Sequence, residues 1–205
     1  MKIIYTGAEA ILYLEKGNLV KERIKKSYRH PDIDLKKRKY PTRRENKILT
    51  KAKKVQINVP AVLEVDENNA KIVMEYIKGD VIKNTLDNYP KEKRKKVSKK
   101  IGEQTAIMHD NEIIHNDLTT SNMILKGEKV YFIDFGLGFI SSKTEDKAVD
   151  IHLIKQAFES KHYLNYEEIL KAFLQGYKKS KYYKETLERL EKVEKRGRYK
   201  RKNSN

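Results

Sequence analysis

Apolar and polar residues alternate along the first 24 residues, in three short runs separated by turn residues. The runs are rich in Ile, Val, Leu and Tyr, and they are interrupted at Gly7 and at Lys16-Gly17-Asn18. Alternation with a period of two is typical of strands with one buried face, and Gly and Asn at the breaks favour tight turns. The pattern therefore predicts an antiparallel meander.

One helix and two further strands are expected to complete this small sheet. Pro41 and Thr42 are typical of a helix start, and apolar residues on neighbouring turns extend the predicted helix to about Lys53. The apolar runs at 61–65 and 70–76 predict strands.

The remainder of the chain has mainly helical periodicity. Between residues 91 and 109, apolar residues recur opposite a strongly charged face, as in a long amphipathic helix. Further helices are expected at about 148–159, 166–178 and 182–194. The last ten residues, RGRYKRKNSN, have almost no apolar side chains and a dense run of cations, so we expect disorder there until an anionic partner binds.

Composition favours one compact unit. A chain of 205 residues with 38% hydrophobic composition suffices for one core, or for two small lobes that share a cleft. No apolar stretch approaches the roughly 20 residues of a membrane helix, and no secretory signal is recognisable, so we expect a cytoplasmic protein with no membrane partner. The sequence has no cysteine, and its five histidines lack zinc-type spacing, so any metal is expected to be bound through oxygen.

The formal net charge of +17 leaves two interpretations open. Such a charge attracts polyanions, which makes RNA a candidate partner. Surfaces rich in Lys and Glu also occur in proteins adapted to high temperature, with no nucleic acid involved.

Two motifs carry the chemistry. Residues 115–122 read H-N-D-L-T-T-S-N, and residues 133–136 read I-D-F-G. Their order and spacing are those of the catalytic loop and the D-F-G motif of kinases. Phosphoryl transfer needs a carboxylate that orients the acceptor, a role that suits Asp117, and oxygen ligands for magnesium, a role that suits Asn122 and Asp134.

A lysine and a glutamate upstream fit the phosphate-binding part of the same machinery. Lys21 lies on the third predicted strand, where its amine can reach the α and β phosphates of ATP, and Glu45 on the predicted helix can pair with it. Either could instead be a solvated surface charge, since the chain holds 46 basic and 29 acidic residues.

The segment V-M-E-Y-I-K-G, from position 73, lies where the hinge between two lobes is expected. The backbone of Glu75 and Ile77 could bind adenine, and Met74 could close the back of the pocket. Ile124 and Ile133 would supply its apolar floor. The alternative is an ordinary buried edge strand with core residues beside it.

The phosphate loop departs from the protein-kinase pattern. Gly7-Ala8-Glu9-Ala10 stands in place of G-x-G-x-x-G, which leaves one glycine where three normally allow close approach of the backbone to phosphate. We therefore expect ATP to be held differently at this loop.

The region after Gly136 is short and has no A-P-E sequence, the part that protein kinases use as a platform for a peptide substrate. Asp150 could brace the catalytic loop from the next helix, or it could be an ordinary helix N-cap.

Several segments together resemble the small atypical kinase subunit of the KEOPS (EKC) complex, a family related to RIO-type kinases. They are G-A-E-A, V-K-E-R-I with Y-R-H-P, H-N-D-L-T-T-S-N-M, I-D-F-G-L-G-F, E-D-K-A-V-D and a terminal R-G-R, and they span nearly the whole chain. The resemblance implies an α+β, two-lobed protein-kinase-like fold. The small N-lobe of antiparallel sheet and one helix would cover 1–77, the reduced, mainly helical C-lobe 78–195, and a basic tail 196–205.

The resemblance also implies activity and partners. The family is expected to use ATP and Mg²⁺ as an ATPase or atypical serine/threonine kinase that supports tRNA threonylcarbamoyladenosine formation. Its small lobe binds a small regulatory subunit, and its large lobe and tail face a metal-dependent catalytic subunit and tRNA. Arg196 and Arg198 match the family's R-G-R tail. Asn116 departs from the glycine usual in the family, although asparagine tolerates left-handed backbone angles.

Three functions follow as hypotheses. The first is an ATP-hydrolysing, autophosphorylating KEOPS subunit, and the second is a free-standing kinase of protein substrates. The third is a nucleotide-bound scaffold that binds RNA through its cationic face.

Overall fold

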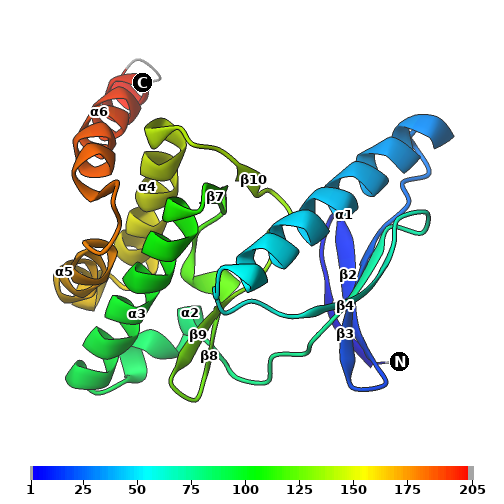
Figure 1. The fold of residues 1–205 in the computed structure, drawn as a ribbon, viewed down its shortest axis with the longest axis horizontal. Coiled ribbons are helices and arrows are strands. Elements are labelled where there is room, and N and C mark those ends of the chain that lie inside the picture. The colour runs from blue at the N-terminus through cyan, green and yellow to red at the C-terminus, as the bar shows by residue number, and fades with distance from the viewer. Residues whose placement is uncertain (1, 203–205) are drawn as a thin grey trace.

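Five antiparallel strands form the sheet of the N-terminal lobe (Figure 1). The computed structural model describes the backbone of residues 2–202 and the side chains of residues 2–195. The order across the sheet is β1 (Lys2–Thr6), β2 (Ala10–Glu15), β3 (Asn18–Arg23), β5 (Lys71–Met74) and β4 (Val62–Asp66). Lys16 and Gly17, at φ of 48° and 83°, make the left-handed turn between β2 and β3. The predicted meander and both further strands are confirmed.

Helix α1 (Pro31–Lys54) begins well before the predicted start at Pro41. Its start carries Pro31 in the first turn together with Asp32 and Asp34, which suit the positive end of the helix. Pro41 lies inside the helix, where a missing N–H and a ring clash cost about 3 kcal/mol. The predicted start was wrong because packing of α1 against both lobes offsets that local cost.

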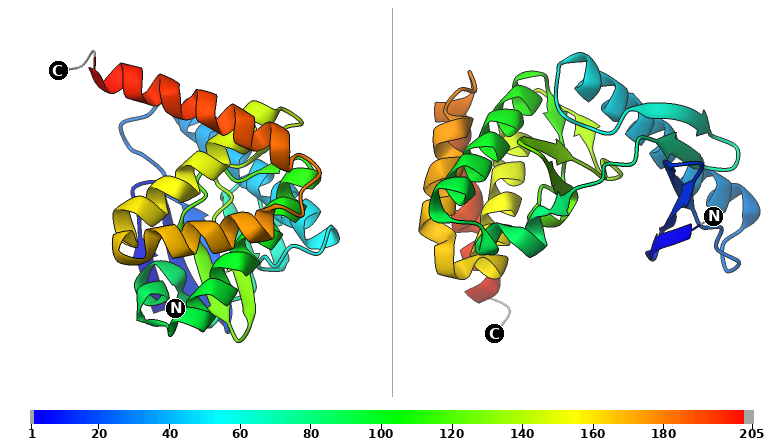
Figure 2. Two further views of the ribbon diagram at one scale, coloured as in Figure 1. Left: turned by 90° about the vertical axis from the view of Figure 1, so that its left-hand side faces the viewer. Right: turned by 90° about the horizontal axis from the view of Figure 1, so that it is seen from below.

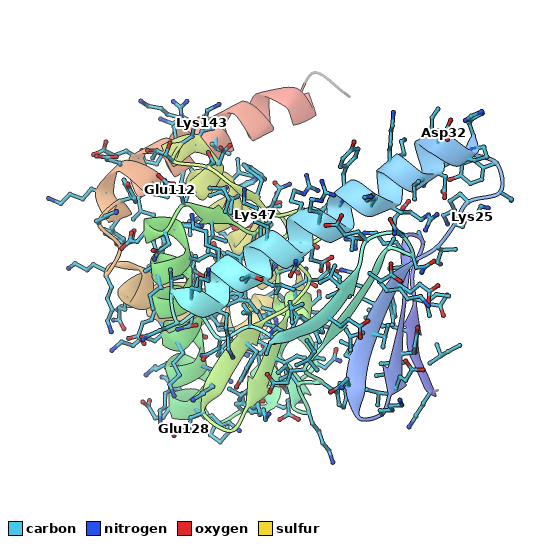
Figure 3. All side chains as sticks on the ribbon, turned by 45° about the vertical axis from the view of Figure 1, so that its right-hand side comes forward. Lys25, Asp32, Lys47, Glu112, Glu128 and Lys143 are labelled. Carbon is cyan, nitrogen blue, oxygen red and sulfur yellow. The ribbon has the colours of Figure 1, made fainter. Side chains whose placement is uncertain are left out.

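Helix α1 connects the two lobes. Figure 3 shows it crossing the molecule from Asp32, at its far end, to Lys47 beside the C-lobe. Ile48 and Leu49 in its second half are buried in the same apolar cluster as Phe135 of the D-F-G motif. The helix therefore holds the residues it carries at a fixed place relative to both lobes.

The C-lobe is mainly helical, as predicted, and the right-hand view of Figure 2 shows the two lobes apart. Its helices are α2 (Ile82–Thr85), α3 (Lys91–Asp110), α4 (Thr144–Lys161), α5 (Tyr166–Tyr177) and α6 (Tyr183–Lys202), with 3-10 turns at η1 (Leu86–Asn88), η2 (Thr120–Asn122) and η3 (Tyr163–Asn165). Its short strands are β6 (Asp80–Val81), β7 (Ile113–Ile114), β8 (Met123–Lys126), β9 (Lys129–Phe132) and β10 (Phe139–Ile140). Strands β6, β8 and β9 form one small sheet, and β7 pairs with β10.

Two glycines let α3 and α5 approach each other at backbone distance. A Cβ atom on Gly102 of α3 would lie 2.0 Å from the carbonyl oxygen of Phe173, and one on Gly176 of α5 would lie 2.0 Å from that of Lys99. No side chain fits at either position, so close packing of these helices requires glycine.

Helix α6 continues to Lys202, through most of the segment expected to be disordered. Its earlier part packs on α4, where Lys155 donates to Glu194 at 2.7 Å and Arg189 pairs with Glu145. Lys and Arg are good helix formers, so a helix anchored upstream can extend into a cationic end. Among the described residues, no helix combines the length and the apolar character needed to span a bilayer.

Candidate active site

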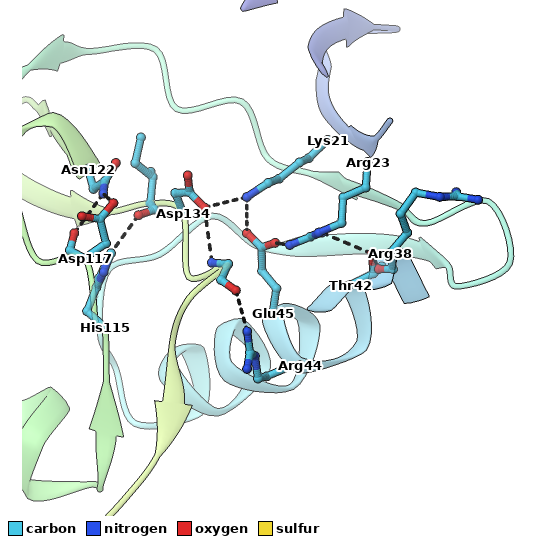
Figure 4. Close-up of polar contacts among 12 residues, drawn as sticks. Lys21, Arg23, Arg38, Thr42, Arg44, Glu45, His115, Asp117, Asn122 and Asp134 are labelled. Carbon is cyan, nitrogen blue, oxygen red and sulfur yellow. Dashed lines mark hydrogen bonds and ion pairs between the residues drawn. The ribbon is translucent and has the colours of Figure 1, made fainter. Parts of the chain in front are cut away.

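Two cations on β3 share one carboxylate of α1. Alternation along the strand directs Lys21 and Arg23 to the same face, and both are almost completely buried. Lys21 Nζ lies 2.8 Å from Glu45 Oε1, and Arg23 Nη2 lies 2.6 Å from Glu45 Oε2 (Figure 4). The predicted Lys21–Glu45 pair is present, and Arg23 completes a buried triad that sequence reasoning missed.

Lys21 also reaches the D-F-G motif. Its amine lies 2.6 Å from Oδ1 of Asp134, whose side chain is 53% exposed and whose φ is 61°. Burial by itself would raise the pKa of Asp134, but the charge and hydrogen bond of Lys21 outweigh it, so that pKa lies below its usual 3.8. Burial would lower the pKa of Lys21, and Glu45 and Asp134 instead hold it above 10.5. Both groups are therefore charged at neutral pH.

Asp150 braces the catalytic loop. Its side chain is fully buried, and its two oxygens accept the backbone N–H groups of His115 and Asn116, both at 2.7 Å. The Asn116 backbone is left-handed, with φ of 61°, which asparagine tolerates. Asp150 lies inside α4, not at its start, so the bracing interpretation is confirmed and the N-cap interpretation is wrong.

The catalytic loop places Asp117 beside Asn122. Asn122 Nδ2 donates to Asp117 Oδ2 at 2.8 Å and to the Asp117 carbonyl at 2.9 Å. The N–H of Ile133 donates to the Asn122 carbonyl at 3.0 Å, which joins this loop to the strand that leads to Asp134. Figure 4 shows the three predicted catalytic and metal-binding side chains near one another.

The donor set suits magnesium. Within residues 2–195, Asn122 Oδ1 and Asp134 Oδ2 have no hydrogen-bond or ion-pair partner. Amide and carboxylate oxygens are ligands that Mg²⁺ accepts, and it commonly takes few protein ligands because phosphate and water supply the rest. The described side chains contain no cluster of three or more His, Asp or Glu residues arranged for a metal.

A cavity of about 470 Å³ lies between the N-terminal sheet, α1 and the D-F-G turn. The predicted site residues in its wall are Gly7, Glu9, Ala10, Lys21, Asp117 and Asp134. Ala8 is not in the wall, and its carbonyl accepts a hydrogen bond from Lys26. The structure therefore brings Gly7, Glu9 and Ala10 of the predicted phosphate loop to the predicted catalytic residues, but not Ala8.

A smaller cavity of about 80 Å³ lies under the hinge and shares Lys21 and Asp134 with the first. The predicted residues in its wall include Met74, Glu75, Ile77, Ile124, Ile133 and Glu45. The N–H of Glu75 donates to the Ala61 carbonyl at 2.8 Å, so the backbone of Glu75 can offer a ligand only its carbonyl. Its small size and mainly apolar lining suit a nucleotide base.

Sequence reasoning missed three cations in the wall of the larger cavity: Arg23, Lys37 and Arg44. Arg23 could have been found from its spacing of two residues after Lys21 on one strand. Lys37 precedes the predicted helix start, so the misplaced start concealed its position. Arg196 and Arg198 lie outside the described side chains.

The RIO domain family matches residues 1–169 of the chain. A relative from Pyrococcus abyssi, the KEOPS complex subunit Bud32, is 47% identical over 97% of this chain and 96% of its own length. A probable serine/threonine-protein kinase BUD32 homolog from Archaeoglobus fulgidus is 36% identical over 96% of this chain and 95% of its own length. A probable bifunctional tRNA threonylcarbamoyladenosine biosynthesis protein from Methanosarcina mazei is 39% identical over 97% of this chain, which spans 36% of that longer protein.

Solved structures share the fold at low sequence identity. A ternary complex of streptomycin, ATP and APH(2")-IIa superposes with a TM-score of 0.63 at 12% identity, over 90% of this chain and 79% of the other. WaaP in complex with acyl carrier protein superposes with a TM-score of 0.67 at 12% identity, over 97% of this chain and 88% of the other. These likenesses show the predicted two-lobed kinase-like fold.

Proposed function

The chain belongs to the RIO domain family, among the small kinase-like subunits of KEOPS, and from this premise we propose that it hydrolyses ATP and phosphorylates itself in support of tRNA threonylcarbamoyladenosine modification. One observation carries the proposal: Lys21, Asp117 and Asp134 line the same cavity, which meets the narrow apolar cavity under the hinge. ATP has the size and polarity for the two together, with its base in the smaller.

Each charged residue has a role in this reaction. When ATP binds, the Lys21 amine would move from Asp134 to the α and β phosphates. Glu45 would keep the Lys21 amine in place. Asn122 and Asp134 would hold Mg²⁺, which neutralises charge on the phosphates when bound. Asp117 keeps one carboxylate oxygen on Asn122 and has the other to orient the acceptor.

For hydrolysis, the phosphoryl acceptor is a water molecule. The water oxygen attacks the terminal phosphorus, the bond to the bridging oxygen of ADP breaks, and the Asp117 carboxylate accepts the water proton. A hydroxyl of the chain in place of water would give self-phosphorylation. Helix α4 begins at Thr144, shortly after Gly136, which leaves little chain for a peptide platform and favours these acceptors over a separate protein.

The proposed partners are those of the family: a small regulatory subunit on the N-lobe, and the metal-dependent catalytic subunit and tRNA on the C-lobe and tail. Ile3, Ile4 and Tyr5 on the edge strand β1 are 57%, 44% and 61% exposed, which supports a protein contact on the N-lobe. The net charge of +17 supports contact with tRNA.

Replacement of Asp117 by alanine tests the proposal. General-base or acceptor-orienting groups typically contribute 10²–10⁴-fold, so ATP turnover in the reconstituted complex with tRNA is expected to fall by about 100-fold or more. Glu92→Ala is the matched control, because Glu92 is 84% exposed and pairs with Lys95 on the surface of α3. Unchanged turnover in Asp117→Ala would refute the assignment.

The same assay separates the other hypotheses. A free-standing kinase would phosphorylate a separate protein rapidly without partners, whereas the proposed subunit gains ATP turnover when its partners and tRNA are added. For an RNA-binding scaffold, Asp117→Ala would leave tRNA modification intact, and truncation before Arg196 would weaken RNA affinity and its salt dependence.

A further inference from the structure

Helix α1 presents a stripe of three residues to the larger cavity. Lys37, Pro41 and Arg44 all contribute to its wall. Their spacing of four and then three residues puts them on one face of the helix over two turns. Because Ile48, Leu49 and Ala52 of α1 are buried in the same core cluster as C-lobe residues, this face keeps a fixed position relative to the catalytic residues.

Arg44 reaches the D-F-G motif from this stripe. Its Nη2 donates to the Gly136 carbonyl at 3.0 Å, as Figure 4 shows. The N–H of the same Gly136 donates to Asp134 Oδ1 at 3.2 Å, so Arg44 and the proposed metal ligand both contact this one residue.

The two cations of the stripe differ from those on β3. Lys21 and Arg23 are neutralised by Glu45, with Asp134 as a further partner of Lys21. Within residues 2–195, neither Lys37 nor Arg44 has a carboxylate partner. Arg44 also has further N–H donors besides the one on the Gly136 carbonyl. Since no carboxylate of residues 2–195 pairs directly with them, these two side chains can contact an anionic group bound in the cavity.

The phosphate loop itself offers few groups that could bind the terminal phosphate. It has a single glycine, and the N–H of Gly7 already donates to the Ala10 carbonyl at 2.9 Å. In the proposed binding mode Lys21 contacts the α and β phosphates. Few hydrogen-bond donors of the N-terminal sheet then remain for the terminal phosphate. The stripe on α1 contributes to the wall of the same cavity.

We propose that Arg44, assisted by Lys37, binds the terminal phosphate of ATP and holds it during hydrolysis. This inference rests on the ATPase function proposed above. Arg44 transfers no proton: its guanidinium contacts oxygens of the phosphoryl group while the bond to ADP breaks, in the manner of an arginine that stabilises negative charge in the transition state. Lys37 supplies a second, more mobile positive charge.

The test compares nucleotides that differ in the terminal phosphate. The full chain, with magnesium, is titrated with the non-hydrolysable analogue AMP-PNP and with ADP, for wild type and for Arg44→Ala, Arg44→Lys and Lys37→Ala. We expect Arg44→Ala to weaken AMP-PNP binding by about 10- to 100-fold while ADP affinity changes by less than about threefold. Arg44→Lys should recover part of the loss, and Lys37→Ala should lose less.

Arg43→Ala is the matched control. Arg43 is the neighbour of Arg44 but pairs with Glu67 outside the cavity, so its replacement should leave the ratio of the two affinities unchanged. Equal weakening of both nucleotides by Arg44→Ala, or no weakening, would overturn the inference while the ATPase proposal stands. If wild type binds neither nucleotide, the ATPase proposal itself fails and the inference fails with it.

Discussion

Replacement of Asp150 by alanine would remove the carboxylate that fixes the backbone of the catalytic loop. Its two oxygens accept the N–H groups of His115 and Asn116, both at 2.7 Å, and His109 Nε2 lies 3.3 Å from one of them. The Asp150 side chain is fully buried, so water cannot simply replace it. The variant therefore leaves two backbone donors without an acceptor in the interior.

The expected cost follows from those two contacts. A hydrogen bond to a charged group contributes about 1.5–3 kcal/mol, which gives about 3–6 kcal/mol for the pair if they were independent. They share one carboxylate, so the sum is not additive, and we expect about 3–5 kcal/mol for Asp150→Ala. Whole domains are stable by only about 5–15 kcal/mol, so this loss is large.

Urea unfolding of the full chain measures the effect. Asp150→Asn keeps one acceptor oxygen and should lose about 1.5–3 kcal/mol, which provides a measurable variant if the alanine protein does not fold. Glu92→Ala, on the exposed face of α3, should stay within about 0.5 kcal/mol of wild type. A free energy of unfolding for Asp150→Ala within about 1 kcal/mol of wild type would refute the bracing role.

Two further predictions concern packing and pH. Gly102→Ala should destabilise the fold by about 2 kcal/mol or more, because the new Cβ would lie 2.0 Å from the Phe173 carbonyl oxygen. Thermal unfolding measures this effect, with Lys95→Ala as the control. Equal unfolding midpoints for the two variants would contradict the prediction. The depressed pKa of Asp134 means that its pairing with Lys21 stabilises the fold above the unfolded value of 3.8 and stops doing so as pH falls through the folded value. The difference in unfolding free energy between wild type and Asp134→Asn should therefore shift in favour of the variant on acidification below about pH 4, and a difference independent of pH would exclude this linkage.

The sequence by itself determined the features that depend on spacing and local conformation. Alternation along the first segments predicted the strand that carries Lys21, and the two motifs fixed the order of Asp117, Asn122 and Asp134. Asparagine at position 116 was expected to tolerate a left-handed backbone, and the structure has φ of 61° there. Each of these features depends on one residue or a few neighbouring residues, whose conformational preferences follow from the residue types.

Only the tertiary structure decided which distant residues meet. Pro41 looks like a helix start locally, yet packing of α1 against two lobes keeps it inside a longer helix. Asp150 could have been an N-cap, and only its burial beneath the catalytic loop made it the brace. Arg44 is one of many cations in the sequence, and the position of α1 brings it to Gly136. Such contacts join segments far apart along the chain, so their energies depend on the folded arrangement and leave no local pattern in the sequence.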